Sequence, residues 1–80
     1  MRVLFFAQAA DAAGCRHEDW NNVASLLTLD SFWEEAIRRH PNLSALRPQC
    51  RVASGMRYLM NDDKINPEDE TAVIPPVSGG

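Results

Sequence analysis

The chain has 80 residues, which is enough for one domain and leaves no room for a second. With 45% hydrophobic and 24% charged residues, its composition is that of a globular protein and argues against disorder, collagen-like repeats and coiled coil. The 8 basic residues are scattered and outnumbered by 11 acidic ones, which gives a net charge of −3. Nucleic-acid binding is therefore not expected, because it requires a clustered positive surface.

The sequence also argues against a membrane or secreted protein. The longest apolar run covers residues 3–7, far short of the roughly 20 residues that a spanning helix needs, and no signal peptide precedes it. Two widely spaced cysteines, Cys15 and Cys50, are too few for an iron–sulfur cluster or a structural zinc site, and nothing supports a disulfide between them. We expect a cytoplasmic protein with reduced thiols and no membrane contact.

The first third of the chain predicts a hairpin. Residues 2–8 are rich in Val, Leu and Phe in a run too short for a helix, which indicates a strand. Because its apolar residues are consecutive, both of its faces are expected to be covered. Small residues at 9–14 favour a turn or loose loop, and residues 15–20 form a weaker second strand that pairs with the first.

The clearest periodicity in the chain predicts an amphipathic helix. The apolar residues that recur at helical spacing are Leu29, Phe32, Trp33, Ala36 and Ile37. Thr28 is placed to cap the N-terminus of this helix, and Pro41 stops it. We expect the apolar stripe to bury against a sheet.

The second half of the chain predicts further strands. A loop at 42–48 leads to a third strand at 49–54, which Gly55 ends, and then to a short fourth strand at 57–60. A turn at 61–63 and one helical turn at 66–69 precede the last strand at 71–74. This order predicts an α+β protein of the β-grasp, or ubiquitin-like, class, with a mixed four- to five-stranded sheet packed on one main helix. Residues 1–74 would form the β-grasp domain, and residues 75–80 a flexible, projecting C-terminal tail.

A single helix covers only one face of such a sheet. Apolar side chains of the first and last strands that point away from the helix would face water unless a partner covers them. We expect this partner surface to include Phe5, Phe6, Val73 and Ile74.

Residue types that commonly carry catalysis are sparse. His17 and His40 are far apart, without cysteines or carboxylates at metal-ligand spacing, so they are interpreted as surface or cap residues and no metal site is expected. Cys15 and Cys50 are better explained as small buried hydrophobes than as nucleophiles. The acidic residues near 62–63 and 68–70 are interpreted as solvated loops rather than as paired catalytic carboxylates.

The C-terminal segment points to a different chemistry. Pro75 and Pro76 cannot donate to a sheet ladder and favour an extended path, so they project the last four residues away from the body. Gly79 and Gly80 lack a Cβ, so a chain that ends with them can pass down a narrow channel. The reactive group would be the terminal carboxylate, which a partner using ATP can convert to an acyl-adenylate and then to a thiocarboxylate or an amide.

The chain resembles the small subunits of molybdopterin synthase, the MoaD-type sulfur carriers, which are ubiquitin-like. The resemblance lies in residues 3–8, in residues 69–80 and in the helix that ends in Arg38-Arg39-His40-Pro41. The resemblance covers most of the chain and is strongest at its two ends. It departs from the family at residues 52–60, where the expected polar turn after the third strand is lacking.

This resemblance implies a sulfurtransferase subunit that is not active alone. An activating enzyme would use ATP to adenylate Gly80 and convert it to a thiocarboxylate, and no cofactor would be bound permanently. The tail would enter a pocket of the large subunit, in a heterotetramer of two small and two large subunits. The sulfur would pass to precursor Z, cyclic pyranopterin monophosphate. The residues threading into the partner would be Pro75, Pro76, Val77, Ser78 and Gly79.

Three alternatives stay open. A sulfur carrier for thiamine or tRNA thiolation would share the terminal glycines but usually lacks the Pro-Pro-Val-Ser segment. A protein modifier would end as an isopeptide on target lysines. A ubiquitin-like interaction module with an inert tail would leave the prolines and the terminal glycines without a reason.

Overall fold

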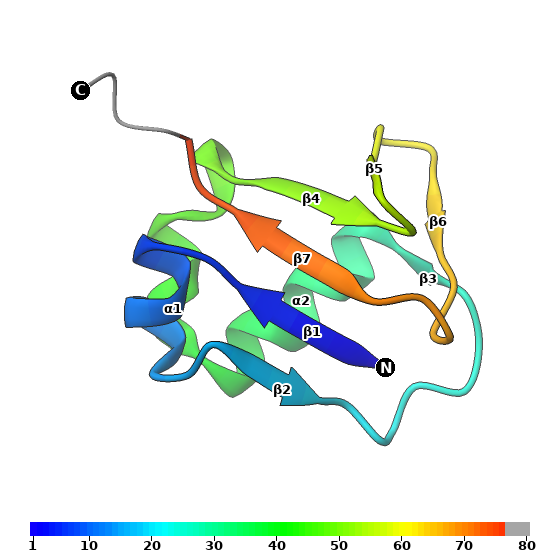
Figure 1. The fold of residues 1–80 in the computed structure, drawn as a ribbon, viewed down its shortest axis with the longest axis horizontal. Helices are drawn as coiled ribbons and strands as arrows, with labels where there is room; N and C mark the ends of the chain where they lie inside the picture. The colour runs from blue at the N-terminus through cyan, green and yellow to red at the C-terminus, as the bar shows by residue number, and fades with distance from the viewer. Residues whose placement is uncertain (77–80) are drawn as a thin grey trace.

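A five-stranded mixed sheet in the order β2-β1-β7-β4-β5 forms one layer of the computed structural model, which describes residues 1–76 (Figure 1). Strand β1 runs parallel to β7, and all other neighbours in this sheet are antiparallel. The strands are β1 (Arg2–Phe5), β2 (His17–Asp19), β4 (Arg51–Ser54), β5 (Arg57–Tyr58) and β7 (Thr71–Ile74). The predicted mixed sheet and the antiparallel pairing of the first two strands are confirmed, whereas the connection between these strands differs from the predicted turn.

The predicted helix is present as α2 (Leu29–Arg39). The backbone N–H of Ser31 donates to the Thr28 side chain over 3.0 Å, which satisfies one of the free donors of the first turn and confirms the cap. Phe32 and Trp33 are buried as predicted, whereas Leu29 and Ile37 are only partly buried because they lie at the margins of the stripe.

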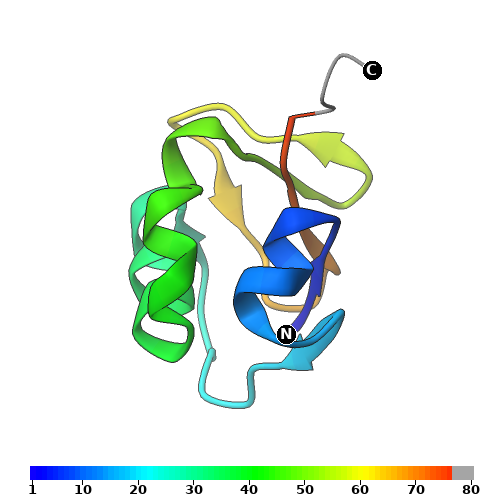
Figure 2. The ribbon, with the colours of Figure 1, turned by 90° about the vertical axis from the view of Figure 1, so that its left-hand side faces the viewer.

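The core lies between the sheet and α2, which form separate layers in Figure 2. Alternate residues of the two central strands point into it, with Val3 and Phe5 from β1, and Thr71 and Val73 from β7. The chain itself covers only one face of the first strand: Phe6, the residue after β1, is 48% exposed, so cover of the outer face stays a prediction.

Residues 9–14 form a helix rather than the predicted loop. Helix α1 (Gln8–Ala13) is rich in alanine, the residue with the highest helix propensity, and Ala9 is buried in the core. Gly14 ends the helix with a φ of 76°, and its N–H donates to the Ala10 carbonyl over 2.8 Å. Consequently β1 ends at Phe5, earlier than predicted.

The loop predicted at 42–48 contains two 3-10 helices, η1 (Pro41–Ala45) and η2 (Arg47–Gln49), and Leu43 is buried. A two-stranded sheet of β3 (Leu27–Thr28) and β6 (Lys64–Ile65) was not predicted. Residues 66–69 form a turn instead of a helical turn, in which the Glu68 N–H donates to the Asn66 side chain over 2.9 Å. Among residues 1–76, no helix has the length and apolar character needed to cross a bilayer.

The fourth strand, β5, covers only residues 57–58 of the predicted 57–60, and a tight turn joins it to β4. Ser54 pairs with Arg57, which leaves a two-residue connection. Both residues of this connection have positive φ, 58° at Gly55 and 67° at Met56, as the favoured two-residue hairpin turns require. Gly55 therefore supplies the turn that the polar residues missing from 52–60 would have made.

Candidate functional site

Strand β7 occupies the middle of the sheet and fixes where the C-terminal segment begins. It pairs with β1 on one side, through Phe5 and Val73, and with β4 on the other, through Arg51 and Ile74. The N–H of Phe6 donates to the Val73 carbonyl over 3.1 Å, so the pairing holds almost to the end of the strand. Pro75 has no N–H and ends the ladder.

The structure places the two prolines differently. Pro75 is buried, whereas Pro76 is exposed, so the packed body extends one residue beyond the predicted boundary at residue 74. Val77, Ser78, Gly79 and Gly80 lie outside the described residues. Their predicted roles as a threaded tail and a carboxylate donor stay predictions.

The four residues predicted as a partner surface divide between the two faces of the sheet. Phe5 is 3% exposed and Val73 is fully buried, so neither side chain is available to a partner, and this part of the prediction is corrected. Adjacent residues in a strand point to opposite faces, which puts Phe6 and Ile74 on the face away from α2.

We call this face the open sheet face and define it by five apolar residues: Leu4, Phe6, Ala53, Ala72 and Ile74. The register supports the grouping, because Leu4 and Ala53 lie opposite Ala72 on its two sides. Tyr58 continues the face on β5 with its side chain 54% exposed, and the Arg51 guanidinium lies 4.9 Å from its ring centroid.

Two hollows border the open sheet face. A groove of about 490 Å³ beside Phe6 is lined by Leu4, Phe5, Phe6, Ala7, Ala10, Arg16 and His17. A smaller hollow of about 280 Å³ at the opposite edge is lined by Ala53, Gly55, Met56, Glu70 and Ala72. A mostly apolar face bordered by hollows and charged side chains has the composition of a protein-binding surface.

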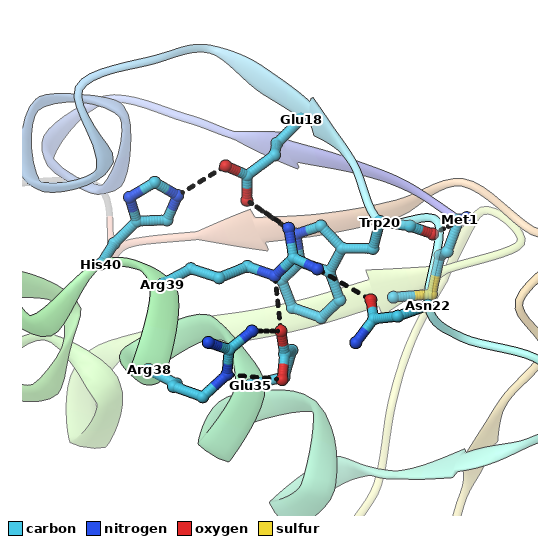
Figure 3. A network of polar contacts seen from close by, with 8 residues as sticks. All are labelled: Met1, Glu18, Trp20, Asn22, Glu35, Arg38, Arg39 and His40. Carbon is cyan, nitrogen blue, oxygen red and sulfur yellow. Dashed lines mark hydrogen bonds and ion pairs between the residues drawn. The ribbon is translucent and has the colours of Figure 1, made fainter.

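Apart from the open sheet face, a cluster of polar side chains lies at the C-terminal end of α2 (Figure 3). Nε2 of His40 is 2.9 Å from Oε2 of Glu18, and the Trp20 indole N–H donates to Oε1 of the same carboxylate over 2.7 Å. Cys15 also offers its sulfur here, and the three ligand atoms lie within 4.8 Å of one another. His40 is the C-cap of α2 as predicted, but its convergence with Cys15 and Glu18 was missed, because His40 lies 22 residues from Glu18.

Beside this cluster, Arg38 and Arg39 both bind Glu35, which belongs to the same helix (Figure 3). The hydrogen bond from Arg38 and that from Arg39 lower the pKa of Glu35 to about 2 against the opposing effect of burial. The Arg39 guanidinium also donates to Asn22 over 2.7 Å, which ties the helix end to the loop after β2.

Both cysteines are free and partly buried. Burial raises the pKa of the Cys50 thiol, and burial together with the Glu18 charge raises that of Cys15. Raised pKa values keep the two thiols protonated at neutral pH, which agrees with the prediction that neither is an activated nucleophile.

Comparison with known proteins supplies the family. The ThiS family matches residues 3–80. The molybdopterin synthase sulfur carrier subunit of Homo sapiens is 37% identical over 83 residues, covering 100% of this chain and 93% of the relative. The protein of the same name from Chlamydomonas reinhardtii is 32% identical, with coverages of 100% and 98%.

Solved structures agree with the fold. A crystal structure of SAMP1 from Haloferax volcanii superposes with a TM-score of 0.82 at 26% identity, covering 100% of this chain and 98% of the other. A structure of small archaeal modifier protein 1 from the same organism gives a TM-score of 0.80 at 23% identity, with coverages of 96% and 97%. The predicted β-grasp class is confirmed.

Proposed function

The chain belongs to the ThiS family, and we propose that it is the sulfur carrier subunit of molybdopterin synthase. The observation that carries this proposal is the 37% identity, over the whole of this chain, to a relative of that name. The fold contributes a central last strand that anchors the C-terminal segment and an apolar open sheet face beside it.

In this function the reactive group is the terminal carboxylate of Gly80. An activating enzyme joins the carboxylate to the AMP portion of ATP and releases pyrophosphate. A sulfur donor then displaces AMP and leaves a thiocarboxylate. The sulfur bonds to precursor Z, and water cleaves the remaining acyl–sulfur bond and supplies the oxygen that restores the carboxylate, so the carrier is regenerated and needs no resident cofactor.

The partner in this proposal is the large subunit, within a heterotetramer that acts in the cytoplasm. The open sheet face supports docking because four of its five apolar residues lie on β7, on β1 or directly after β1, and β7 is the strand that leads into Pro75 and Pro76. A partner seated there would lie next to the start of the tail. The large subunit would supply the catalytic pocket, and this chain the sulfur.

The first test is the intact mass of the chain isolated from cells, which should show one oxygen replaced by sulfur. Thiocarboxylated chain, large subunit and precursor Z, mixed without ATP, should then yield molybdopterin. Each carrier holds one sulfur and the dithiolene needs two, so two carriers should be consumed per product.

Deletion of Gly80 should abolish this conversion and leave the melting temperature unchanged, because Pro75 is the last buried residue of the described chain. Asp62→Asn, an exposed change in a surface turn, is the matched control and should retain full activity. Synthesis by the truncated chain would overturn the proposal.

The modifier alternative has one specific support, the similarity to SAMP1. It predicts that proteolytic digests of whole cells contain lysines joined through an isopeptide to the C-terminal residues of this chain. Such conjugates, without any product from precursor Z, would favour that function. A sulfur carrier for thiamine or tRNA thiolation would instead show the thiocarboxylate mass but no transfer to precursor Z.

A further inference from the structure

The cluster at the end of α2 has the composition of a transition-metal site. Thiolate, imidazole and carboxylate are the three ligand types that zinc takes in proteins. They come from three separate parts of the chain: Cys15 follows α1, Glu18 lies on β2, and His40 is the C-cap of α2. We propose that Cys15, Glu18 and His40 bind a divalent zinc-type cation, with the fourth coordination position open to water or to an external ligand.

The distances allow this with small movements. Ligands of a tetrahedral zinc site lie roughly 3.3–3.7 Å apart, given bonds of about 2.0–2.3 Å to each. The His40 and Glu18 atoms are now 2.9 Å apart and must separate slightly, whereas the cysteine sulfur, within 4.8 Å, must approach. Each adjustment is within the reach of a side-chain rotation.

Surrounding contacts hold the ligands in place. The Trp20 N–H occupies Oε1 of Glu18 and leaves Oε2 facing His40, which is the kind of outer hydrogen bond that orients ligating carboxylates. The Phe5 ring stands edge-on to the His40 ring, with centroids 5.7 Å apart. The side chains of His40 and Glu18 are 16% and 24% exposed, so the site is partly shielded from water.

The charges around the site are nearly balanced. Ligation by a thiolate and a carboxylate neutralises a divalent cation. Among the positive side chains near the site, Arg39 has its Nη1 4.0 Å from Oε1 of Glu18, and its guanidinium is already paired with Glu35 over 2.6 Å. Cys15 also lines an open surface hollow of about 350 Å³, together with Ala10, Asp11, Gly14 and Arg16.

Binding requires no redox step. The metal binds Nε2 of His40 in the tautomer of the neutral imidazole that carries its single hydrogen on Nδ1, so a hydrogen held between Nε2 and Oε2 of Glu18 moves to Nδ1 through the solvent. The Cys15 S–H bond breaks, its proton passes to the solvent, and the metal–sulfur bond forms.

The chain contains its own controls, because it has two cysteines and two histidines and the cluster uses one of each. Reduced full-length chain should be titrated with Co²⁺, which reports thiolate ligation by charge-transfer absorption. One equivalent should bind and be displaced by Zn²⁺. Cys15→Ser should remove the charge-transfer band, and His40→Gln should weaken binding at least about tenfold. The control variants Cys50→Ser and His17→Gln should change neither the charge-transfer band nor the affinity for Co²⁺.

A measurement on the unmodified sequence keeps the test independent of variant folding. Zn²⁺ should slow alkylation of Cys15 at least about tenfold and leave the rate at Cys50 unchanged, as read by peptide mass spectrometry. Absence of saturable binding at millimolar Co²⁺, a charge-transfer band that persists in folded Cys15→Ser, or equal Zn²⁺ protection of both cysteines would each overturn the proposal.

Discussion

Phe5 and Phe6 are neighbours in sequence, but their side chains lie on opposite faces of the sheet. Phe5 is 3% exposed and packs in the core, whereas Phe6 is 48% exposed on the open sheet face. Phe5→Ala should therefore lower the free energy of unfolding by about 3–5 kcal/mol, the usual cost of truncating a buried phenylalanine. Phe6→Ala should lower the free energy of unfolding by only about 1 kcal/mol, because about half of the Phe6 side chain is exposed to water in the free chain and contributes nothing to folding.

Partner binding should respond in the opposite order. The half of Phe6 that remains exposed corresponds to about 100 Å² of apolar surface, worth about 2.5 kcal/mol if the large subunit covers it. That energy sets an upper limit of about 70-fold on the loss of affinity in Phe6→Ala, and ordering costs at the interface reduce it toward tenfold.

The assay combines urea unfolding of the free chain with calorimetric titration of the large subunit into each folded variant. Lys64→Ala, an exposed change on β6 in the separate two-stranded sheet, is the control and should alter neither quantity appreciably. If Phe6→Ala destabilises the fold as much as Phe5→Ala, the assignment of the two faces is refuted. If it folds normally and binds the large subunit with unchanged affinity, the open sheet face is not the docking surface.

Three further predictions concern stability. Phe32→Ala should cost about 3–5 kcal/mol and change the near-ultraviolet circular dichroism, because the fully buried Phe32 ring stacks on Trp20 with centroids 5.1 Å apart; an unchanged urea midpoint would contradict the packing. Glu35→Gln should lower the free energy of unfolding by about 1–2 kcal/mol at pH 7. This difference from wild type should vanish as the pH falls from about 5 to 2, because the lowered pKa of Glu35 stabilises the fold only while the carboxylate is ionised. The exposed Glu34→Gln should show no such pH dependence in the same unfolding series. Met56→Asn should raise the free energy of unfolding by about 0.5–1 kcal/mol, and with it the melting temperature, because Met56 is fully exposed at a φ of 67° that asparagine tolerates better. Met60→Asn should raise neither quantity.

Regular patterns in the sequence predicted the parts of the fold that local physics determines. Helix α2 combines a periodic stripe, a capping threonine and a proline stop, and its bounds were predicted within two residues. The last strand was predicted because four apolar or β-branched residues stand directly before two prolines. In both, several local signals agree, and tertiary contacts only reinforce them.

The missed features depend on contacts between distant residues. The alanines of α1 were assigned to a loop because a six-residue helix has no readable period, and its position depends on Ala9 packing in the core. Strands β3 and β6 have two residues each and form only because residues 27–28 meet residues 64–65. Likewise, no spacing along the chain relates His40 to Cys15 and Glu18, which the sheet and α2 bring together.

The partner surface shows why a strand sequence alone does not identify an interface. Consecutive apolar residues in β1 suggested that both faces were covered, yet only the residues facing α2 are buried in this chain. If the first strand evolved for two covered faces, the cover of the second must come from outside the chain. Phe6 and Ile74 then serve binding while Phe5 and Val73 serve folding, so alternate positions in the same two strands carry separate constraints. This separation allows a small domain to present an apolar face to a partner without depending on that partner to fold.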